Sequence, residues 1–180
     1  MSATRAGATP GETAIVVPVD LPIAVRRLRD RFDPAAARGV PAHVTLLYPF
    51  MPPGQLTEEV RGQVAAVVAT EPSFSFSLAR MGRWPNVVWL APEPPEPFLR
   101  LARALMQAFP EHPPYGGAHE DVVPHLTIAQ DERLDWLVAA ERALPALLPI
   151  PDVAREAQLM VMDQSGRWST FWRMPLGRRG

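Results

Sequence analysis

The stretch "PAHVTLLYPF" (41–50) decides how this sequence is interpreted. It is an apolar run typical of a buried strand, yet it contains a histidine and a threonine two residues apart, which packing alone does not require. A second apolar stretch, "VVPHLTIAQ" (122–130), carries the same pair at the same spacing. The chain therefore presents one polar signature twice, on two predicted strands that are far apart in the sequence.

Strand geometry puts the polar residues of each stretch on one face, because side chains two apart on a strand point the same way. His43 and Thr45 share a face, and so do His125 and Thr127. Within each pair the side chains are separated by roughly 6–7 Å along the strand. The intervening aliphatic residues point to the other side, where they can pack against helices while the polar pair lines a cleft.

The remaining sequence places these strands in a duplicated order of elements. Alternating or β-branched runs predict strands, and apolar residues at helical spacing predict helices. We expect strands at 13–19, 41–50, 73–80, 86–92, 122–130, 154–163 and 167–176, and helices at 21–32, 56–70, 96–109 and 131–148. Each half is therefore β-α-β-α-β, with one extra strand at the end. If a pseudo-twofold axis relates the halves, the two polar pairs face each other across one cleft.

The same order of elements predicts the domain organisation. We expect one domain at residues 13–177, preceded by a flexible N-terminal tail at 1–12. Its two lobes are expected at about 13–80 and 84–177, with the seam between the halves inside 71–86. A length of 180 residues suits one domain or two small lobes that share a core. We expect this domain to be a monomer.

Composition narrows the classes of function. The hydrophobic fraction of 47% and the charged fraction of 21% are ordinary for a soluble globular protein. A net charge of −1 gives no overall attraction to nucleic acid or to a membrane surface. The chain has no cysteine, which excludes thiolate nucleophiles and cysteine metal sites. No apolar run approaches the roughly 20 residues of a membrane helix, so we expect a cytoplasmic protein that does not bind membranes.

Two imidazoles and two hydroxyls around one cleft suit the chemistry of a phosphodiester. A neutral imidazole can accept a proton from water or from a hydroxyl group, and a protonated one can donate a proton to the leaving oxygen. The hydroxyls of Thr45 and Thr127 can donate hydrogen bonds to the non-bridging phosphate oxygens, where negative charge increases in the transition state. No metal ion or other cofactor is needed. A lone motif of this kind is more often structural, whereas two matching motifs on equivalent strands favour function.

The two motifs, "HVTL" (43–46) and "HLTI" (125–128), resemble the paired H-x-[ST]-hydrophobic motifs of the two-histidine (2H) phosphoesterase superfamily. That superfamily includes the 2′–5′ RNA ligase and cyclic phosphodiesterase proteins. The resemblance covers about residues 13–177. It implies a bilobal α+β fold in which antiparallel sheets curve around a central groove and helices lie outside.

The resemblance also implies an activity: metal-independent opening or hydrolysis of 2′,3′-cyclic phosphates or 2′–5′ linked nucleotides. It makes His43 and His125 the acid/base pair and Thr45 and Thr127 the phosphate ligands, with a nucleotide or an RNA end as substrate. Which histidine is the base and which the acid stays open, because the roles exchange when the reaction reverses. Two alternatives also stay open: 2′–5′ RNA ligation, and a nucleotide- or RNA-binding module without turnover.

Weaker candidates surround the paired motif. Tyr48 falls on the core face by strand alternation, so we expect it to pack unless a bulge turns it. Trp168 is a candidate for stacking on a nucleobase. Possible phosphate contacts are arginines, each of which is also an ordinary surface residue: Arg80, Arg83, Arg133 and Arg173. Of these, Arg83 and Arg133 are the ones we carry forward as substrate contacts.

The insert "PEHPPYGGAHEDVVP" (110–124) is longer than the matching connection in the first half, and we expect it at the mouth of the groove. It contains His112 and His119. The run 119–121 (His-Glu-Asp) suggests a metal site together with His125. We do not expect one, because surface loops rich in such residues are usually just solvated.

Overall fold

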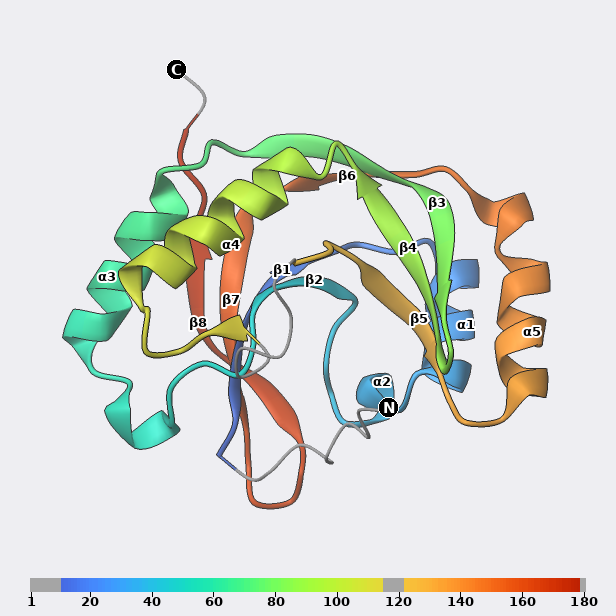
Figure 1. Ribbon diagram of the computed structural model, residues 1–180, viewed down its shortest axis with the longest axis horizontal. Helices are drawn as coiled ribbons and strands as arrows, with labels where there is room; N and C mark the ends of the chain where they lie inside the picture. Colours follow the sequence, from blue (N-terminus) through green and yellow to red (C-terminus); the bar gives the residue numbers. More distant parts are fainter. Residues whose placement is uncertain (1–10, 115–121, 179–180) are drawn as a thin grey trace.

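Two four-stranded antiparallel sheets form the framework of the computed structural model, which describes residues 11–114 and 122–178 (Figure 1). The first sheet has the order β2-β1-β7-β8, and the second has the order β5-β4-β3-β6. The strands of the first sheet are β1 (Thr13–Pro18), β2 (His43–Leu47), β7 (Glu156–Met162) and β8 (Trp168–Pro175). Those of the second are β3 (Phe74–Trp84), β4 (Val87–Glu93), β5 (Leu126–Gln130) and β6 (Ile150–Ala154). The α+β class with antiparallel sheets is therefore confirmed.

Each sheet takes strands from both halves of the sequence. Strand β3 follows the first motif strand but pairs with β4 in the second sheet, and β7 follows the second motif strand but pairs with β1 in the first. The two sheets therefore do not correspond one to one to the two predicted halves. This exchange leaves the motif strands β2 and β5 at one edge of each sheet, where they approach each other.

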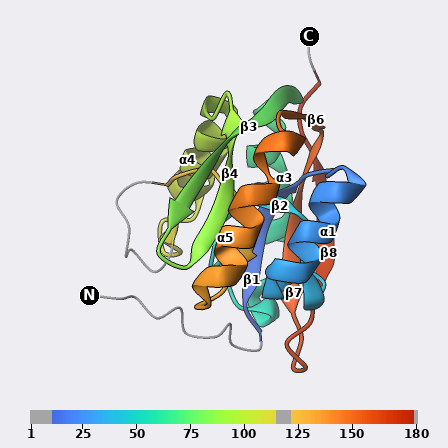
Figure 2. The same cartoon turned by 90° about the vertical axis from the view of Figure 1, so that its right-hand side faces the viewer.

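Helices cover the sheets on the sides away from this junction (Figures 1 and 2). Helices α3 (Glu58–Ala69) and α4 (Glu96–Ala108) pack on the first sheet, while α1 (Ile23–Phe32) and α5 (Leu134–Ala143) pack on the second. Helix α4 shows why: its apolar residues recur at helical spacing and are buried against β2. Each motif strand thus has an apolar side held by a helix from the opposite half of the sequence.

One α-helix and one β-strand were not predicted from the sequence. The first is α2 (Pro34–Ala37), whose start is capped by the Asp33 side chain. The second is β6, which carries Pro151. Proline lacks the N–H that a central strand would need, and β6 escapes this requirement because it is the edge strand of its sheet. The expected helix at 131–148 ends at Ala143, and a short 3-10 helix follows from the proline at 145.

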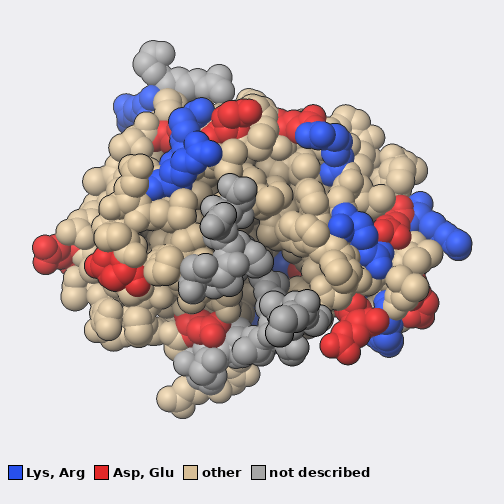
Figure 3. Space-filling model, viewed as in Figure 1, with Lys and Arg blue, Asp and Glu red and all other residues tan. Residues whose placement is uncertain are grey.

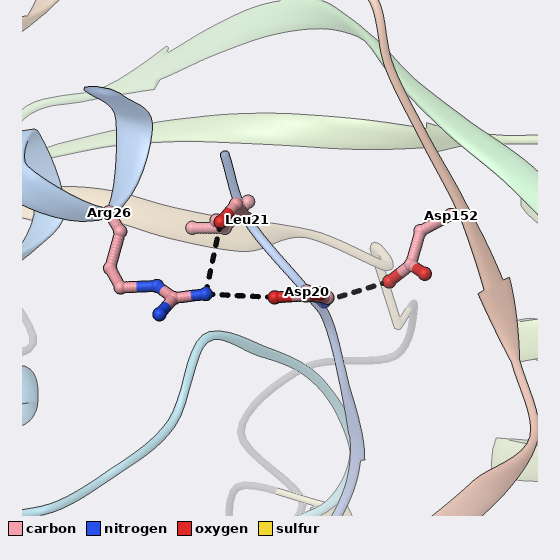
Figure 4. Close-up of polar contacts among 4 residues, drawn as sticks. All are labelled: Asp20, Leu21, Arg26 and Asp152. Carbon is pink, nitrogen blue, oxygen red and sulfur yellow. Dashed lines mark hydrogen bonds and ion pairs between the residues drawn. The ribbon is translucent and has the colours of Figure 1, made fainter. Parts of the chain in front are cut away.

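A polar cluster ties the chain that leaves the first sheet to the edge of the second (Figure 4). Arg26 on α1 donates to the Asp20 carboxylate at 2.8 Å and to the Leu21 carbonyl at 3.2 Å. The backbone N–H of Asp20 donates to the Asp152 carboxylate on β6 at 2.8 Å. Two of these contacts are exposed and the third, to Leu21, is partly buried, so they fix geometry more than they add stability. None of the helices described here has the length and apolar character needed to cross a bilayer.

Candidate active site

One cavity of about 220 Å³ brings the two polar signatures together. His43 and Thr45 line it from β2, Thr127 lines it from β5, and His125 lines it from the position just before β5. All four side chains are half-buried. The two sheets thus meet along their motif edges, with one imidazole and one hydroxyl supplied from each side.

The sequence folds this way because each motif strand separates its polar and apolar residues. Val44 and Leu46 on β2 are buried in the main core, as are Leu126 and Ile128 on β5. Helices α4 and α1 pack against these strands. Burial of four aliphatic side chains, each worth about 1.5–3 kcal/mol, therefore fixes the direction of the polar side chains.

Both histidine rings are held by the same contact. His43 Nδ1 lies 2.8 Å from the carbonyl oxygen of Pro41, and His125 Nδ1 lies 2.8 Å from that of Val123. A carbonyl oxygen can only accept a hydrogen bond, so Nδ1 carries the proton in each ring. Nε2 is then the nitrogen of each ring that can exchange a proton with a ligand.

A bulge in each motif strand turns one further side chain toward the cavity. In β2 the pairing with β1 skips Leu46, and in β5 the pairing with β4 skips Ile128. Two consecutive residues of each strand are consequently buried, and alternation resumes with the opposite phase. Tyr48 and Gln130 therefore line the cavity. Tyr48 therefore does not lie on the core face, because a bulge turns it, which is the exception that sequence analysis allowed. Gln130 was not predicted.

The floor of the cavity on the side of the first sheet is apolar and aromatic. Val16 on β1 and Met160 on β7 are buried there, with Tyr48 and Trp168 packed against them. The rings of Tyr48 and Trp168 are 6.4 Å apart between centroids. The Tyr48 hydroxyl donates to the Glu12 carboxylate at 2.5 Å. Trp168, predicted as a candidate for stacking, thus lies in the cavity.

The wall beside this floor comes from the connection between α1 and β2, which the sequence did not indicate as functional. Asp33 and Arg38 line the cavity from this connection. Asp33 is buried and pairs with the buried Arg29, whose Nη2 lies 2.9 Å from Oδ2. Arg29 also donates to the carbonyl oxygen of Val40 at 2.9 Å. The buried arginine therefore fixes both ends of the wall.

Two tryptophans hold the second histidine. The His125 ring contacts Trp84 edge to face, with centroids 4.6 Å apart, and lies 6.1 Å from Trp89. The rings of Trp84 and Trp89 are 4.9 Å apart. Gly82 makes room for this group, because a Cβ there would lie 2.2 Å from the Trp89 ring. This pair of tryptophans was not predicted: Trp84 lies between the predicted strands 73–80 and 86–92, and Trp89 lies within the second of them.

The predicted arginine contacts lie elsewhere in the structure. Among the described residues that line the cavity, neither Arg83 nor Arg133 is found. Arg83 pairs with Glu141 at 2.8 Å. Arg133 pairs with Asp131 and lies over the Trp136 ring, and its hydrogen bonds hold the pKa of Asp131 below its ordinary value.

The other weaker candidates are also outside the cavity. Arg80 pairs with Glu93, and Arg173 pairs with Glu156. His112 packs edge-on against Phe50. In the described ranges, no group of three His, Asp or Glu side chains could hold a metal ion. The run 119–121 considered for such a site lies outside the described residues.

The fold and the paired motifs together are those of the two-histidine phosphoesterase superfamily. The family model of the 2′-5′ RNA ligase superfamily matches residues 17–166, and the chain belongs to that superfamily. No curated protein matches the chain by sequence. The predicted family is therefore confirmed.

Solved structures show the same fold. LigT of E. coli, solved with phosphate, is 21% identical over 95% of this chain and 100% of its own, with a TM-score of 0.56. TT0787 of Thermus thermophilus is 20% identical over 94% of this chain and 100% of its own, with a TM-score of 0.63. Usb1 of Kluyveromyces marxianus is 15% identical over 93% of this chain and 99% of its own, with a TM-score of 0.53. Another structure of LigT contains 3′-AMP.

Proposed function

We propose that this protein is a metal-independent phosphodiesterase acting on 2′,3′-cyclic phosphates or on 2′–5′ linked nucleotides. The observation that carries the proposal is the convergence of His43, Thr45, His125 and Thr127 on one cavity. The family supports phosphoester chemistry. The hydrolytic direction and the substrate are part of the proposal.

The proposed mechanism uses the two imidazoles through Nε2. In hydrolysis of a cyclic phosphate, one neutral imidazole takes a proton from the attacking water as the new P–O bond forms. The other imidazole, protonated, gives its proton to the ribose oxygen as the old P–O bond breaks. The product is a phosphate monoester, and each positioned proton transfer contributes about 10²–10⁴-fold in rate.

The threonine hydroxyls are proposed to bind the phosphate. Thr45 and Thr127 each stand two residues after their histidine on the same strand face. Their hydroxyls can donate to the non-bridging oxygens, which gain negative charge in the transition state. Because the bond to Nδ1 already fixes each ring, little reorganisation is needed when the phosphate arrives.

A short substrate fits the surface better than a long RNA. On the face shown in Figure 3, arginines are interspersed with acidic residues, and those described form no continuous basic strip. A long nucleic acid is held mainly by many phosphate contacts, each from a lysine or arginine. The structures of LigT with 3′-AMP and with ATP are consistent with nucleotide-sized ligands in this fold. We therefore propose a mononucleotide, a dinucleotide or a strand end.

Product analysis tests the proposal. Nucleoside 2′,3′-cyclic phosphates and 2′–5′ dinucleotides are incubated with the protein in excess chelator, alongside the double variant His43→Ala/His125→Ala. We expect phosphate monoesters from the wild-type protein alone. Turnover no faster than that of the double variant would rule out hydrolysis of these substrates, and binding without product would favour a non-catalytic module.

Ligation is the second candidate, because the superfamily is described as 2′-5′ RNA ligases. It is the same opening of a cyclic phosphate, with a 5′-hydroxyl in place of water as the nucleophile: the 5′-oxygen bonds to phosphorus as the bond from phosphorus to the 3′-oxygen breaks, and a 2′–5′ diester forms. RNA ends that carry a 2′,3′-cyclic phosphate and a 5′-hydroxyl are mixed with the protein. A 2′–5′ joined product at a yield above that of the double variant would support it.

A further inference from the structure

Arg38 is a charged feature of the cavity that the mechanism above leaves unused. Its side chain is exposed and lines the cavity. Its guanidinium forms no ion pair with any residue in the described ranges. By contrast, the arginines that sequence analysis selected are neutralised by nearby carboxylates, as shown for Arg83 and Arg133.

The charge balance of the cavity makes this arginine stand out. Apart from the histidines, the charged groups described in its lining are Arg38 and Asp33. The Asp33 carboxylate is already compensated by the buried guanidinium of Arg29 at 2.9 Å. Among the described residues that line the cavity, no carboxylate therefore remains to offset the positive charge of Arg38. An anionic ligand would offset it.

The backbone around Arg38 is built to hold it in place. Its N–H donates to the Ala35 carbonyl at 3.1 Å, and its carbonyl accepts from the Trp168 N–H at 2.7 Å. The next residue, Gly39, has a φ of +88°, and a Cβ there would lie 2.8 Å from the Trp168 carbonyl oxygen. Only glycine fits this turn without strain. The Arg38 backbone is thus fixed to β8, and its side chain lines the same cavity as Tyr48 and Trp168.

We propose that Arg38 is the anion-binding residue of the cavity and contacts a phosphate group of the ligand. This inference rests on the proposed function for the identity of the ligand as a nucleotide. The phosphate is either the one at the histidines or a second one on the same nucleotide. An arginine presents a planar fork of donors that matches two phosphate oxygens at once, which a lysine cannot reproduce.

Binding experiments test this without relying on turnover. The affinities of adenosine, 3′-AMP and adenosine 3′,5′-bisphosphate are measured by calorimetry for wild type, Arg38→Gln and Arg38→Lys. Arg27→Gln is the matched control, because it removes the same charge from an exposed position on α1 that does not line the cavity. Thermal melting checks that each variant is folded.

We expect Arg38→Gln to weaken phosphate-bearing ligands by about 10- to 100-fold, with Arg38→Lys in between. Equal weakening of both nucleotides would assign Arg38 to the phosphate at the histidines, and weakening of the bisphosphate alone would assign it to a 5′-phosphate. The inference would be overturned if Arg38→Gln lost no more affinity than Arg27→Gln. It would also be overturned if the wild-type protein bound the two nucleotides no more tightly than adenosine. If the protein hydrolyses no cyclic phosphate but Arg38→Gln still lowers the affinity for the two nucleotides and not that for adenosine, the proposed function fails and this inference stands.

Discussion

Tyr48 and Gln130 occupy equivalent places, each five residues after the histidine of its motif strand and each turned into the cavity by a bulge. The pseudo-symmetry of the molecule therefore extends beyond the motifs themselves. At these matched places the chain has an aromatic residue on one side and an amide on the other. That difference makes one side of the cavity more apolar than the other.

Replacing Gln130 should affect ligand binding rather than stability. We expect Gln130→Ala to raise KM several-fold while the free energy of unfolding changes by less than about 1 kcal/mol, because the side chain lines the cavity. The matched control is Ile128→Ala on the same strand, which empties a buried site and should cost about 2–5 kcal/mol. Steady-state kinetics and urea unfolding measure both. A large loss of stability in Gln130→Ala would contradict the bulged register.

Loss of the buried arginine should destabilise the wall of the cavity. Arg29→Met leaves the Asp33 carboxylate buried without its partner, at a cost of about 3–5 kcal/mol. In Arg29→Met/Asp33→Asn the asparagine can still cap α2, so this double variant should be less destabilised than the single one. Urea unfolding measures both. If Arg29→Met lies within about 1 kcal/mol of wild type, the pair does not hold the wall.

Gly82 should matter to catalysis without touching the substrate. In Gly82→Ala the new methyl group would overlap the Trp89 ring, which must move and disturb Trp84 and His125. We expect kcat to fall about tenfold or more, as misplacement of a catalytic group does, with the protein still folded. The control is Gly62→Ala on α3, where a Cβ meets open space and activity should be unchanged. Equal activities of the two variants would show that the tryptophans do not position His125.

The turn between β7 and β8 should give a pH-dependent contribution to stability. Hydrogen bonds from the Ser165 hydroxyl and from backbone N–H groups hold the pKa of Asp163 below its ordinary value. A carboxylate with a lowered pKa in the folded state stabilises the protein at pH values above the pKa that it has in the unfolded chain. This stabilisation is lost as the pH falls through the folded-state pKa. Asp163→Asn should therefore be less stable than wild type at pH 7, with a smaller difference below about pH 4. Urea titrations at the two pH values test this, and a constant difference would refute it.

Sequence reasoning found what depends on local patterning. Alternation and the repeated spacing of His43 with Thr45 and of His125 with Thr127 predicted the motif strands and their polar faces. Strand exchange between the sheets could not be predicted, because β3 and β7 carry no signal for which strand they pair with. Register was equally hidden: a single extra residue in β2 reversed the face of Tyr48.

The cation of the site was missed for a different reason. Eighteen arginines look alike in the sequence, and what separates them is whether a carboxylate lies nearby in the fold. Arg83 and Arg133 were carried forward from the sequence as substrate contacts, and the fold pairs both with acids. The signals for α2 were visible in retrospect: a capping aspartate, a proline at the first helical position and a glycine shortly after the end.

The most direct test of the central claim compares the two single histidine variants on one substrate. Turnover of adenosine 2′,3′-cyclic phosphate in chelator is measured for wild type, His43→Ala, His125→Ala and the double variant. If the imidazoles work as one acid/base pair, each single variant loses about 10²–10⁴-fold in kcat, and the double variant is hardly slower than either. The account would be contradicted if the wild-type protein turns over the substrate above background and either single variant keeps the wild-type rate.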